Sequence, residues 1–267
     1  MSAASARSFL FVPGDRPERF SKAEASGADI IIIDLEDAVS APVKHAARIN
    51  AVAWLSTHPE AAVRINSIGT EDFGRDVDAL DGHSLTVVLA KTERAAHVRE
   101  IRRLLPSSTI VALIETANGV LNAPKIAQAG ANRLALGNVD LATELGVDPA
   151  DRTALLFARG ALVLASAAAR IPGPIDGVTT DLRNPEVIAS DSRYAASLGF
   201  AGKLCIHPAQ VDAARAAFSP TEAELDWAHG IMQALETAGP EAGALALNGH
   251  MIDAPVVERA SRILRRA

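Results

Sequence analysis

Short apolar segments alternate along the chain with longer segments in which apolar and polar residues recur at helical spacing. Most of the short segments are continuously apolar, which is typical of parallel strands that are buried on both faces. Eight segments fit this description, and we expect them to be strands: residues 8–14, 29–37, 61–66, 85–93, 109–115, 133–140, 175–181 and 202–208.

The segments between these strands begin and end at proline, glycine and polar residues, which are the signals that start and stop helices. They predict helices at residues 16–27, 42–59, 93–106, 118–130, 153–171 and 184–200. The strand ends recur at the interval of one strand–helix unit, so eight such units predict an α/β fold, the (β/α)8 TIM barrel. A doubly wound open sheet is the alternative. It is disfavoured because no G-x-G-x-x-G follows the first expected strand.

The pattern changes after residue 218, where the barrel is complete. Residues 1–218 are therefore expected to form the barrel domain, and residues 219–267 a C-terminal helical extension. Amphipathic patterns predict helices at 219–239 and 254–267. The glycine- and alanine-rich segment 240–253 between them predicts a loop or short turn. This extension could pack under the barrel or reach a neighbouring subunit.

The bulk properties fit an ordinary globular protein. The chain has 267 residues, of which 49% are hydrophobic, and a formal net charge of −6. The negative charge argues against nucleic acid or an anionic membrane as a partner. Cys205 is the sole cysteine, which fits the reducing cytoplasm, and its apolar neighbours predict a buried core residue. No segment approaches the ~18 apolar residues of a membrane span, and the first residues do not resemble a signal peptide.

Polar residues follow the expected strands at the end where a parallel barrel carries its active site. Arg64 closes the third strand and Lys91 the fourth, and carboxylates follow three others. These carboxylates are Asp34, Glu36 and Asp37 after the second strand, Glu115 after the fifth and Asp140 after the sixth.

Glu115 and Asp140 should converge, because adjacent strands lie ~4.8 Å apart. Two unpaired anions so close would repel, and a hard divalent cation removes the conflict. Mg²⁺ is the first choice for two carboxylates and Mn²⁺ the second. The alternative is that Arg64 and Lys91 form ion pairs with these two anions and no metal binds. Arg64 could itself be a plain ion pair or a bidentate clamp on a substrate carboxylate.

Eight motifs occur in an order that is similar to a known family. The chain resembles the citrate lyase β-subunit-like CoA-ester lyases of the HpcH/HpaI aldolase superfamily, in the malyl-CoA and citramalyl-CoA lyase branch. The resemblance runs from Phe9 to about Arg259, and the motifs are FLFVPGDRPERF, DIIIIDLEDAV, VRIN, LAKTE, ALIETANGV, LALGNVDLATELG, GFAGKLCIHPAQV and NGHMIDAPVV.

The resemblance implies a magnesium site at Glu115 and Asp140, with Glu115 also facing the substrate. It implies that Arg64 grips the carboxylate of the 2-oxoacid half. It also places coenzyme A near five residues: Phe11, Arg19, Lys22, Ile206 and His207. The residue pattern alone leaves a capping or core-edge position as an equal alternative for His207.

The "MID" aspartate, here Asp253, is implied to enter the active site of an adjacent subunit as a lid-like segment and to move a proton at the acetyl-CoA methyl carbon. This implies a homo-oligomer, with a trimer favoured. Two positions depart from the family pattern. His250 stands where a lysine is frequent, and residues 91–94 read KTER, so the acyl-chain preference stays open.

The predicted function is magnesium-dependent reverse Claisen cleavage of a 3-hydroxy-acyl-CoA, of citramalyl-CoA or malyl-CoA type, to acetyl-CoA and a 2-oxoacid. Asp253 and Arg64 would act on the substrate, and Asp34, Glu36 and Asp37 would orient Arg64 or hold metal-bound waters. Three alternatives remain: a citryl-CoA or citryl-carrier-protein lyase β-subunit, a CoA-independent pyruvate aldolase, and a non-catalytic acyl-CoA-binding accessory protein.

Overall fold

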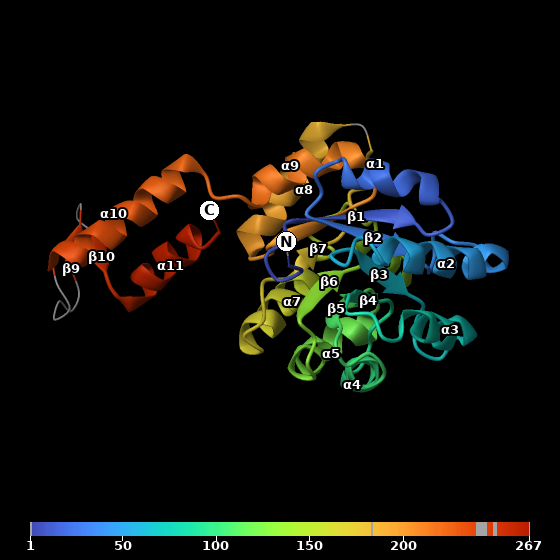
Figure 1. Ribbon diagram of the computed structural model, residues 1–267. Helices are drawn as coiled ribbons and strands as arrows, with labels where there is room; N and C mark the ends of the chain where they lie inside the picture. The colour runs from blue at the N-terminus through green and yellow to red at the C-terminus, as the bar shows by residue number, and fades with distance from the viewer. Residues whose placement is uncertain (1, 183, 239–244, 248–249, 267) are drawn as a thin grey trace. The chain divides into compact units, whose positions relative to one another are not determined.

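Eight parallel strands pair in sequence order, and β8 pairs with β1 to close a barrel (Figure 1). This confirms the predicted TIM barrel. The computed structural model describes residues 2–182, 184–238, 245–247 and 250–266. The strands are β1 (Ser8–Pro13), β2 (Ile30–Asp34), β3 (Ala62–Ile65), β4 (Thr86–Leu89), β5 (Thr109–Ile114), β6 (Arg133–Leu136), β7 (Ile175–Asp176) and β8 (Gly202–Cys205).

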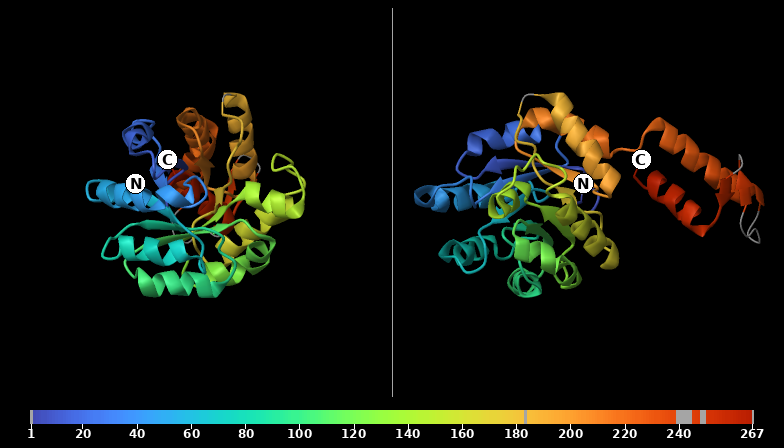
Figure 2. Two further views of the ribbon diagram at one scale, coloured as in Figure 1. Left: turned by 90° about the vertical axis from the view of Figure 1, so that its right-hand side faces the viewer. Right: turned by 180° about the vertical axis from the view of Figure 1, so that it is seen from behind.

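Helices surround the strands, as Figure 2 shows from two further sides. They are α1 (Phe20–Glu24), α2 (Lys44–Leu55), α3 (Glu71–Leu80), α4 (Ala95–Leu104), α5 (Ala117–Gln128), α6 (Asn138–Leu145), α7 (Leu156–Ala168), α8 (Pro185–Leu198) and α9 (Val211–Phe218), with short 3-10 turns η1 (Pro17–Arg19), η2 (Ala41–Val43) and η3 (Pro208–Gln210). The sequence analysis did not identify α3, α6 and α9. For α3 a signal was present, because the Thr70 hydroxyl accepts a hydrogen bond from the Phe73 N–H as an N-cap.

Both faces of the strands are buried, which explains why their sequences are continuously apolar. Alternate residues point into the barrel or out towards the helices. In β2, Ile30 and Ile32 belong to the interior cluster, whereas Ile31 and Ile33 pack against the helices. The interior cluster comprises Ala3, Ala6, Phe9, Ile30, Ile32, Ala62, Val88, Val111, Leu113, Ala135, Ile175 and Leu204. Cys205 is fully buried in the outer cluster, as predicted.

The chain divides by its contacts into two compact units, Met1–Phe218 and Ser219–Ala267. The second unit holds α10 (Glu222–Ala238), β9 (Leu245–Leu247), β10 (His250–Ile252) and α11 (Ala254–Leu264), with its own apolar cluster that includes Ile231, Ile252 and Ile263. The loop or short turn predicted for 240–253 is wrong for the described residues, because β9 and β10 form an antiparallel hairpin. Residues 239–244 and 248–249 lie outside the described part.

No helix in the described part of the chain combines the length and apolar character that a membrane span requires.

A buried arginine ties the first residues of the chain to the start of β6. The Arg133 guanidinium donates hydrogen bonds to the carbonyl oxygens of Ala3 (2.8 Å), Ala6 (2.7 Å) and Gly173 (2.8 Å), and it is 1% exposed. It also lies over the Phe9 ring, 5.4 Å from the ring centre. Burial without a carboxylate partner lowers the pKa of Arg133 to about 9. Arg133 therefore links three backbone carbonyl groups from separate parts of the chain through one buried side chain.

Arg133→Met should lower the free energy of unfolding by about 2–4 kcal/mol, because three buried carbonyl groups would lose a charged donor. Urea denaturation followed by circular dichroism measures this change. Arg103→Met is the matched control, since Arg103 is exposed and its described ion pair is with Glu100, one turn away on α4. It should change stability by less than about 0.5 kcal/mol. Equal effects of the two substitutions would contradict the anchoring role.

Candidate active site

The alternation inside the barrel continues to the carboxyl ends of the strands and places polar side chains there. After Ile30 and Ile32, the next inward position of β2 is Asp34. By the same spacing, Arg64 follows Ala62 in β3, and Glu115 follows Leu113 at the end of β5. Asp34 and Arg64 are also direct neighbours in the pairing of β2 with β3. The fold therefore brings together side chains that lie far apart in the sequence.

A cavity of about 80 Å³ lies at this end of the barrel, and Glu115 and Asp140 both line it. Its other lining residues are Phe11, Arg64, Leu113, Leu136, Gly137, Asn138, Val139, Val178 and Leu204. A second cavity, of about 180 Å³, shares Asn138 and Val178 with the first, and its lining includes Arg152, Arg159 and Lys203.

The structure corrects the prediction that Asp140 ends a strand. β6 ends at Leu136, and Asp140 lies in the first turn of α6. A short connection through Gly137 turns the chain from strand to helix within one apolar run. Asp140 still reaches the cavity, because α6 begins directly above the end of β6. Lys91 likewise lies in a turn after β4, which ends at Leu89.

Arg64 pairs with the carboxylates of the β2 segment. Its Nε donates to Oδ1 of Asp34 at 2.7 Å, and its Nη2 donates to Oδ2 of Asp34 at 2.5 Å. Nη1 lies 3.0 Å from Oε2 of Glu36, and the guanidinium lies 4.8 Å from the centre of the Phe11 ring. Although burial opposes it, the bonds to Asp34 raise the pKa of Arg64. Arg64 is thus a fixed cation with one edge at the cavity.

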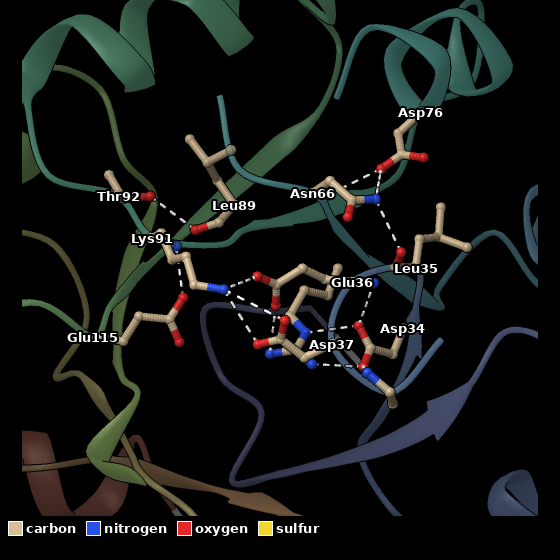
Figure 3. Close-up of polar contacts among 12 residues, drawn as sticks. Asp34, Leu35, Glu36, Asp37, Asn66, Asp76, Leu89, Lys91, Thr92 and Glu115 are labelled. Carbon is tan, nitrogen blue, oxygen red and sulfur yellow. Dashed lines mark hydrogen bonds and ion pairs between the residues drawn. The ribbon is translucent and has the colours of Figure 1, made fainter. Parts of the chain in front are cut away.

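Lys91 pairs with the same segment. Its Nζ donates to Oε1 of Glu36 and lies 3.2 Å from Oδ2 of Asp37. Figure 3 shows Lys91 between Glu115 on one side and Glu36 and Asp37 on the other. Burial raises the pKa of Glu36 in spite of the Arg64 charge. The described ion pairs of Arg64 and Lys91 therefore go to Asp34, Glu36 and Asp37, and the predicted alternative in which they neutralise Glu115 and Asp140 is wrong.

Glu115 is left buried with a single hydrogen bond from the protein backbone. It is 2% exposed, and its Oε1 accepts a bond of 2.6 Å from the Lys91 N–H. Burial, the negative charge of Glu36 and, to a smaller extent, that of Asp140 raise the pKa of Glu115 to about 8. A buried carboxylate that is not matched by a cation has this shift, which is also common at functional sites.

Gly137 provides the room for Glu115. A Cβ atom at Gly137 would lie 2.4 Å from the Glu115 Cβ and 2.6 Å from its Oε2, distances that exclude any larger residue. The next residue, Asn138, fixes the loop after β7, because its side chain donates to the Val178 carbonyl and accepts from the Val178 N–H. The sequence analysis gave neither residue a role, although both stand in the LALGNVDL motif.

A bracket behind the site holds the segment after β2. The Lys44 Nζ donates to the carbonyls of Leu35 and Glu36 and to the Asn66 side chain. Asn66 in turn donates to Leu35 and to the buried carboxylate of Asp76 (Figure 3). This network was not predicted from the sequence. It fixes the backbone that carries Glu36.

The residues expected near coenzyme A are more dispersed. Phe11 lines the cavity, whereas Arg19 and Lys22 lie on η1 and α1, and Ile206 and His207 follow β8. These segments follow two strands that pair with each other, β1 and β8. The His207 side chain accepts a bond from the Ala209 N–H and caps η3, which is the capping alternative considered for it.

Asp253 belongs to the second unit, Ser219–Ala267. Its carboxylate accepts a hydrogen bond from the Val256 N–H at 3.2 Å and caps the start of α11. The cap fixes the backbone at the junction of β10 and α11. It accounts for an aspartate at this position in structural terms, and a role in a reaction remains a prediction.

The donor set of the cavity fits a hard cation with few protein ligands. Glu115 is a buried carboxylate that forms no ion pair among the described residues, and Asp140 lines the same space. No group of three or more His, Cys, Asp or Glu side chains in the described ranges could hold a metal ion, so a transition-metal cluster of that kind is not built there. Mg²⁺ commonly takes one or two carboxylates and completes its shell with water and substrate oxygens.

Comparisons with known proteins give one consistent result. The sequence profile of the family described as HpcH/HpaI aldolase/citrate lyase matches residues 7–208. The chain is 40% identical over 274 residues to a "citrate lyase subunit beta-like protein" of Mycobacterium tuberculosis, covering 99% of this chain and 96% of that protein. It is 34% identical over 263 residues to a "(3S)-malyl-CoA thioesterase" of Cereibacter sphaeroides, covering 94% and 89%.

A solved structure is similar over the whole chain. The protein CitE from M. tuberculosis, in complex with magnesium, acetoacetate and coenzyme A, has a TM-score of 0.85 and 37% sequence identity, covering 99% of this chain and 98% of that chain. A citrate lyase beta subunit from the same organism, complexed with oxaloacetate and magnesium, has a TM-score of 0.74 and 37% identity, covering 81% of this chain and 98% of that one.

The raised pKa of Glu115 predicts a signed pH dependence for the metal-free protein. The folded protein holds this proton up to about pH 8, whereas the unfolded chain releases it near the ordinary value of 4.5. The folded state therefore binds more protons between these values, and stability must fall as the pH rises through this window. Glu115→Gln removes the loss and should be more stable than wild type by on the order of 3 kcal/mol at pH 7.5.

Urea denaturation in EDTA at pH 5.0 and 7.5 measures the difference, which should be small at the lower pH. Glu100→Gln is the control, because the pKa shift of Glu100 has the opposite sign: a hydrogen bond from Arg103 lowers that pKa. That variant should gain no stability as the pH rises. If the difference in unfolding free energy between Glu115→Gln and wild type did not change with pH, the pKa of Glu115 would not be raised in the folded state.

Proposed function

The chain belongs to the HpcH/HpaI aldolase/citrate lyase family, a family of lyases, and from this premise we propose that it is a magnesium-dependent carbon–carbon lyase acting on a 3-hydroxy-acyl-CoA. The observation that carries the proposal is the buried Glu115 carboxylate. It lines the same cavity as Asp140, and burial together with the negative charge of Glu36 raises the pKa of Glu115 to about 8. The magnesium in the similar CitE complexes supports the choice of metal.

Glu115 and Asp140 would hold the metal. Mg²⁺ bound there would act as a Lewis acid on the substrate hydroxyl and the carboxylate beside it. Gly137 gives the Glu115 side chain its space, and the Lys91 N–H fixes one of its oxygens. The bracket of Lys44, Asn66 and Asp76 would keep the neighbouring carboxylates from moving towards the metal site.

Arg64 would grip the carboxylate of the 2-oxoacid half. Asp34 fixes the guanidinium through two bonds, and one edge of the side chain lines the cavity. A guanidinium that is already oriented loses little rotamer freedom when it binds a carboxylate. Asp34, Glu36 and Asp37 would therefore act through Arg64 and Lys91 rather than on the substrate.

The reaction needs one proton to pass from the substrate hydroxyl to solvent and one to reach carbon. Cleavage of the bond between the hydroxyl-bearing carbon and the α-carbon gives a 2-oxoacid and the enolate of acetyl-CoA. Asp253 would deliver a proton to the enolate carbon as a general acid. This role requires the lid-like segment of a neighbouring subunit, so a homo-oligomer, with a trimer favoured, is part of the proposal. The CoA moiety would lie along Phe11, Arg19, Lys22, Ile206 and His207.

The substrate is proposed as a class. Citramalyl-, malyl-, methylmalyl- and citryl-CoA differ by small groups next to the reacting carbons, and a methylene in a pocket changes preference by only about 1–3 kcal/mol. The ligands of similar structures, acetoacetate and oxaloacetate, are oxo-acids. The similarity to a malyl-CoA thioesterase supports a second candidate, in which water cleaves the thioester. A cytoplasmic location is proposed from the single buried cysteine.

A panel of these four thioesters tests the activity. At least one should release a 2-oxoacid in a dehydrogenase-coupled assay with Mg²⁺ and none in EDTA. Glu115→Gln and Asp140→Asn should each lower kcat by at least about 100-fold, because each removes a ligand from the metal. Glu100→Gln is the control and should keep wild-type turnover. Release of free thiol without 2-oxoacid would identify the thioesterase instead, and full activity of either variant in chelator would exclude the metal role.

Asp253→Asn should lower turnover by about 10²–10⁴-fold, the usual contribution of a general acid, and leave binding of CoA thioesters nearly unchanged. Asparagine caps helices as well as aspartate does, so α11 should remain folded. Calorimetry with the unreacted thioester and single-turnover kinetics separate the two effects. Asp226→Asn, at an exposed position on α10, is the matched control. Loss of binding with normal turnover at saturation would contradict the role.

A further inference from the structure

Lys91 has a backbone conformation that side chains rarely adopt. Its φ is +48°, and among the described residues only Arg170 shares a positive φ without being glycine. The left-handed region is unfavourable for residues with a Cβ, and such residues persist where the surroundings fix them and frequently lie at functional sites. The adjoining residue provides this fixation, because the Thr92 N–H donates to the Leu113 carbonyl (3.0 Å) and its hydroxyl donates to the Leu89 carbonyl (2.8 Å).

The left-handed turn directs the Lys91 N–H at Oε1 of Glu115, at 2.6 Å. The other oxygen of Glu115, Oε2, lies against Gly137, where no Cβ could fit. The carboxylate is thus held from one side by a backbone donor and from the other by the backbone of Gly137. An ordinary right-handed conformation at Lys91 would turn the N–H away and release the carboxylate.

The side chain of Lys91 contacts the segment after β2 and not Glu115. Its ammonium group bonds Glu36 and lies 3.2 Å from Asp37, while Glu36 is also paired with Arg64 at 3.0 Å (Figure 3). Without Lys91, Glu36 would have Arg64 as its sole cation, and that guanidinium would be drawn further into the β2 segment. The ammonium group therefore keeps part of the Arg64 charge available at the cavity.

We propose that Lys91 is a positioning residue with two separable functions: its strained backbone sets the Glu115 carboxylate for magnesium, and its ammonium group sets Arg64 for the substrate carboxylate. The inference rests on the proposed function and extends it to a residue that contacts neither the metal nor the reacting atoms. The backbone function predicts an effect on metal affinity, and the side-chain function predicts an effect on KM.

Two substitutions separate these functions. Lys91→Gly removes the ammonium group but accepts a positive φ, whereas Lys91→Ala removes the same group and, with no bond to Glu36 to hold it, should relax from the unfavourable left-handed turn. Calorimetry with MgCl₂ alone should show binding to Lys91→Ala about tenfold weaker than to Lys91→Gly, the scale expected when support of a metal ligand is lost. Both variants should raise KM for the thioester by about tenfold, and Lys91→Arg or added propylammonium should restore much of it, because the side chain is 38% exposed.

Arg170 supplies the matched control, since it has a φ of +56° at an exposed position after α7. Arg170→Gly and Arg170→Ala repeat the same backbone comparison and should differ in thermal stability but not in magnesium affinity. Equal magnesium affinity of Lys91→Gly and Lys91→Ala would overturn the backbone function, and no rescue by cations would overturn the side-chain function. If wild-type protein binds no magnesium, the proposed function fails, and this inference fails with it.

Discussion

The carboxylates at the mouth of the barrel outnumber the cations that pair with them, and the other features of the site follow from this imbalance. Arg64 and Lys91 pair with the three carboxylates of the β2 segment, so that Glu115 stays buried without an ion pair among the described residues. A protein seldom keeps such a group unless something else compensates it, because desolvating an unpaired charge is expensive. The strained turn at Lys91 and the absent side chain at Gly137 both serve to hold this one carboxylate. A metal ion bound here, as proposed, would resolve the charge conflict that these features maintain.

Much of this arrangement was readable from the sequence. The continuous apolar runs predicted the parallel strands, and alternation along them carries Asp34, Arg64 and Glu115 to the mouth of the barrel. Asp140 lies in the expected cavity but on α6 and not on a strand, because the connection between β6 and α6 is the single residue Gly137. The 240–253 segment was misjudged since two three-residue strands leave too short an alternation to recognise beside glycine and alanine.

Which cation meets which carboxylate could not be predicted. The pairing of Arg64 with Asp34 instead of Glu115 depends on the register of β2 against β3 and on a loop held by Lys44 and Asn66. These are contacts between distant segments, and periodicity carries no information about them. The left-handed conformation of Lys91 is equally hidden, because lysine is not a residue that suggests a positive φ.

Another buried carboxylate in the same barrel makes the contrast clear. Asp176 in β7 is as buried as Glu115, but Lys203 and Arg159 bond it at 2.9 and 3.0 Å. Although burial alone would raise the pKa of Asp176, these two cations hold it below the ordinary value. The fold can therefore neutralise a carboxylate between its strands. Glu115 is buried to the same degree and left unpaired, so its environment is explained better by a ligand from outside the chain than by any limit of the barrel.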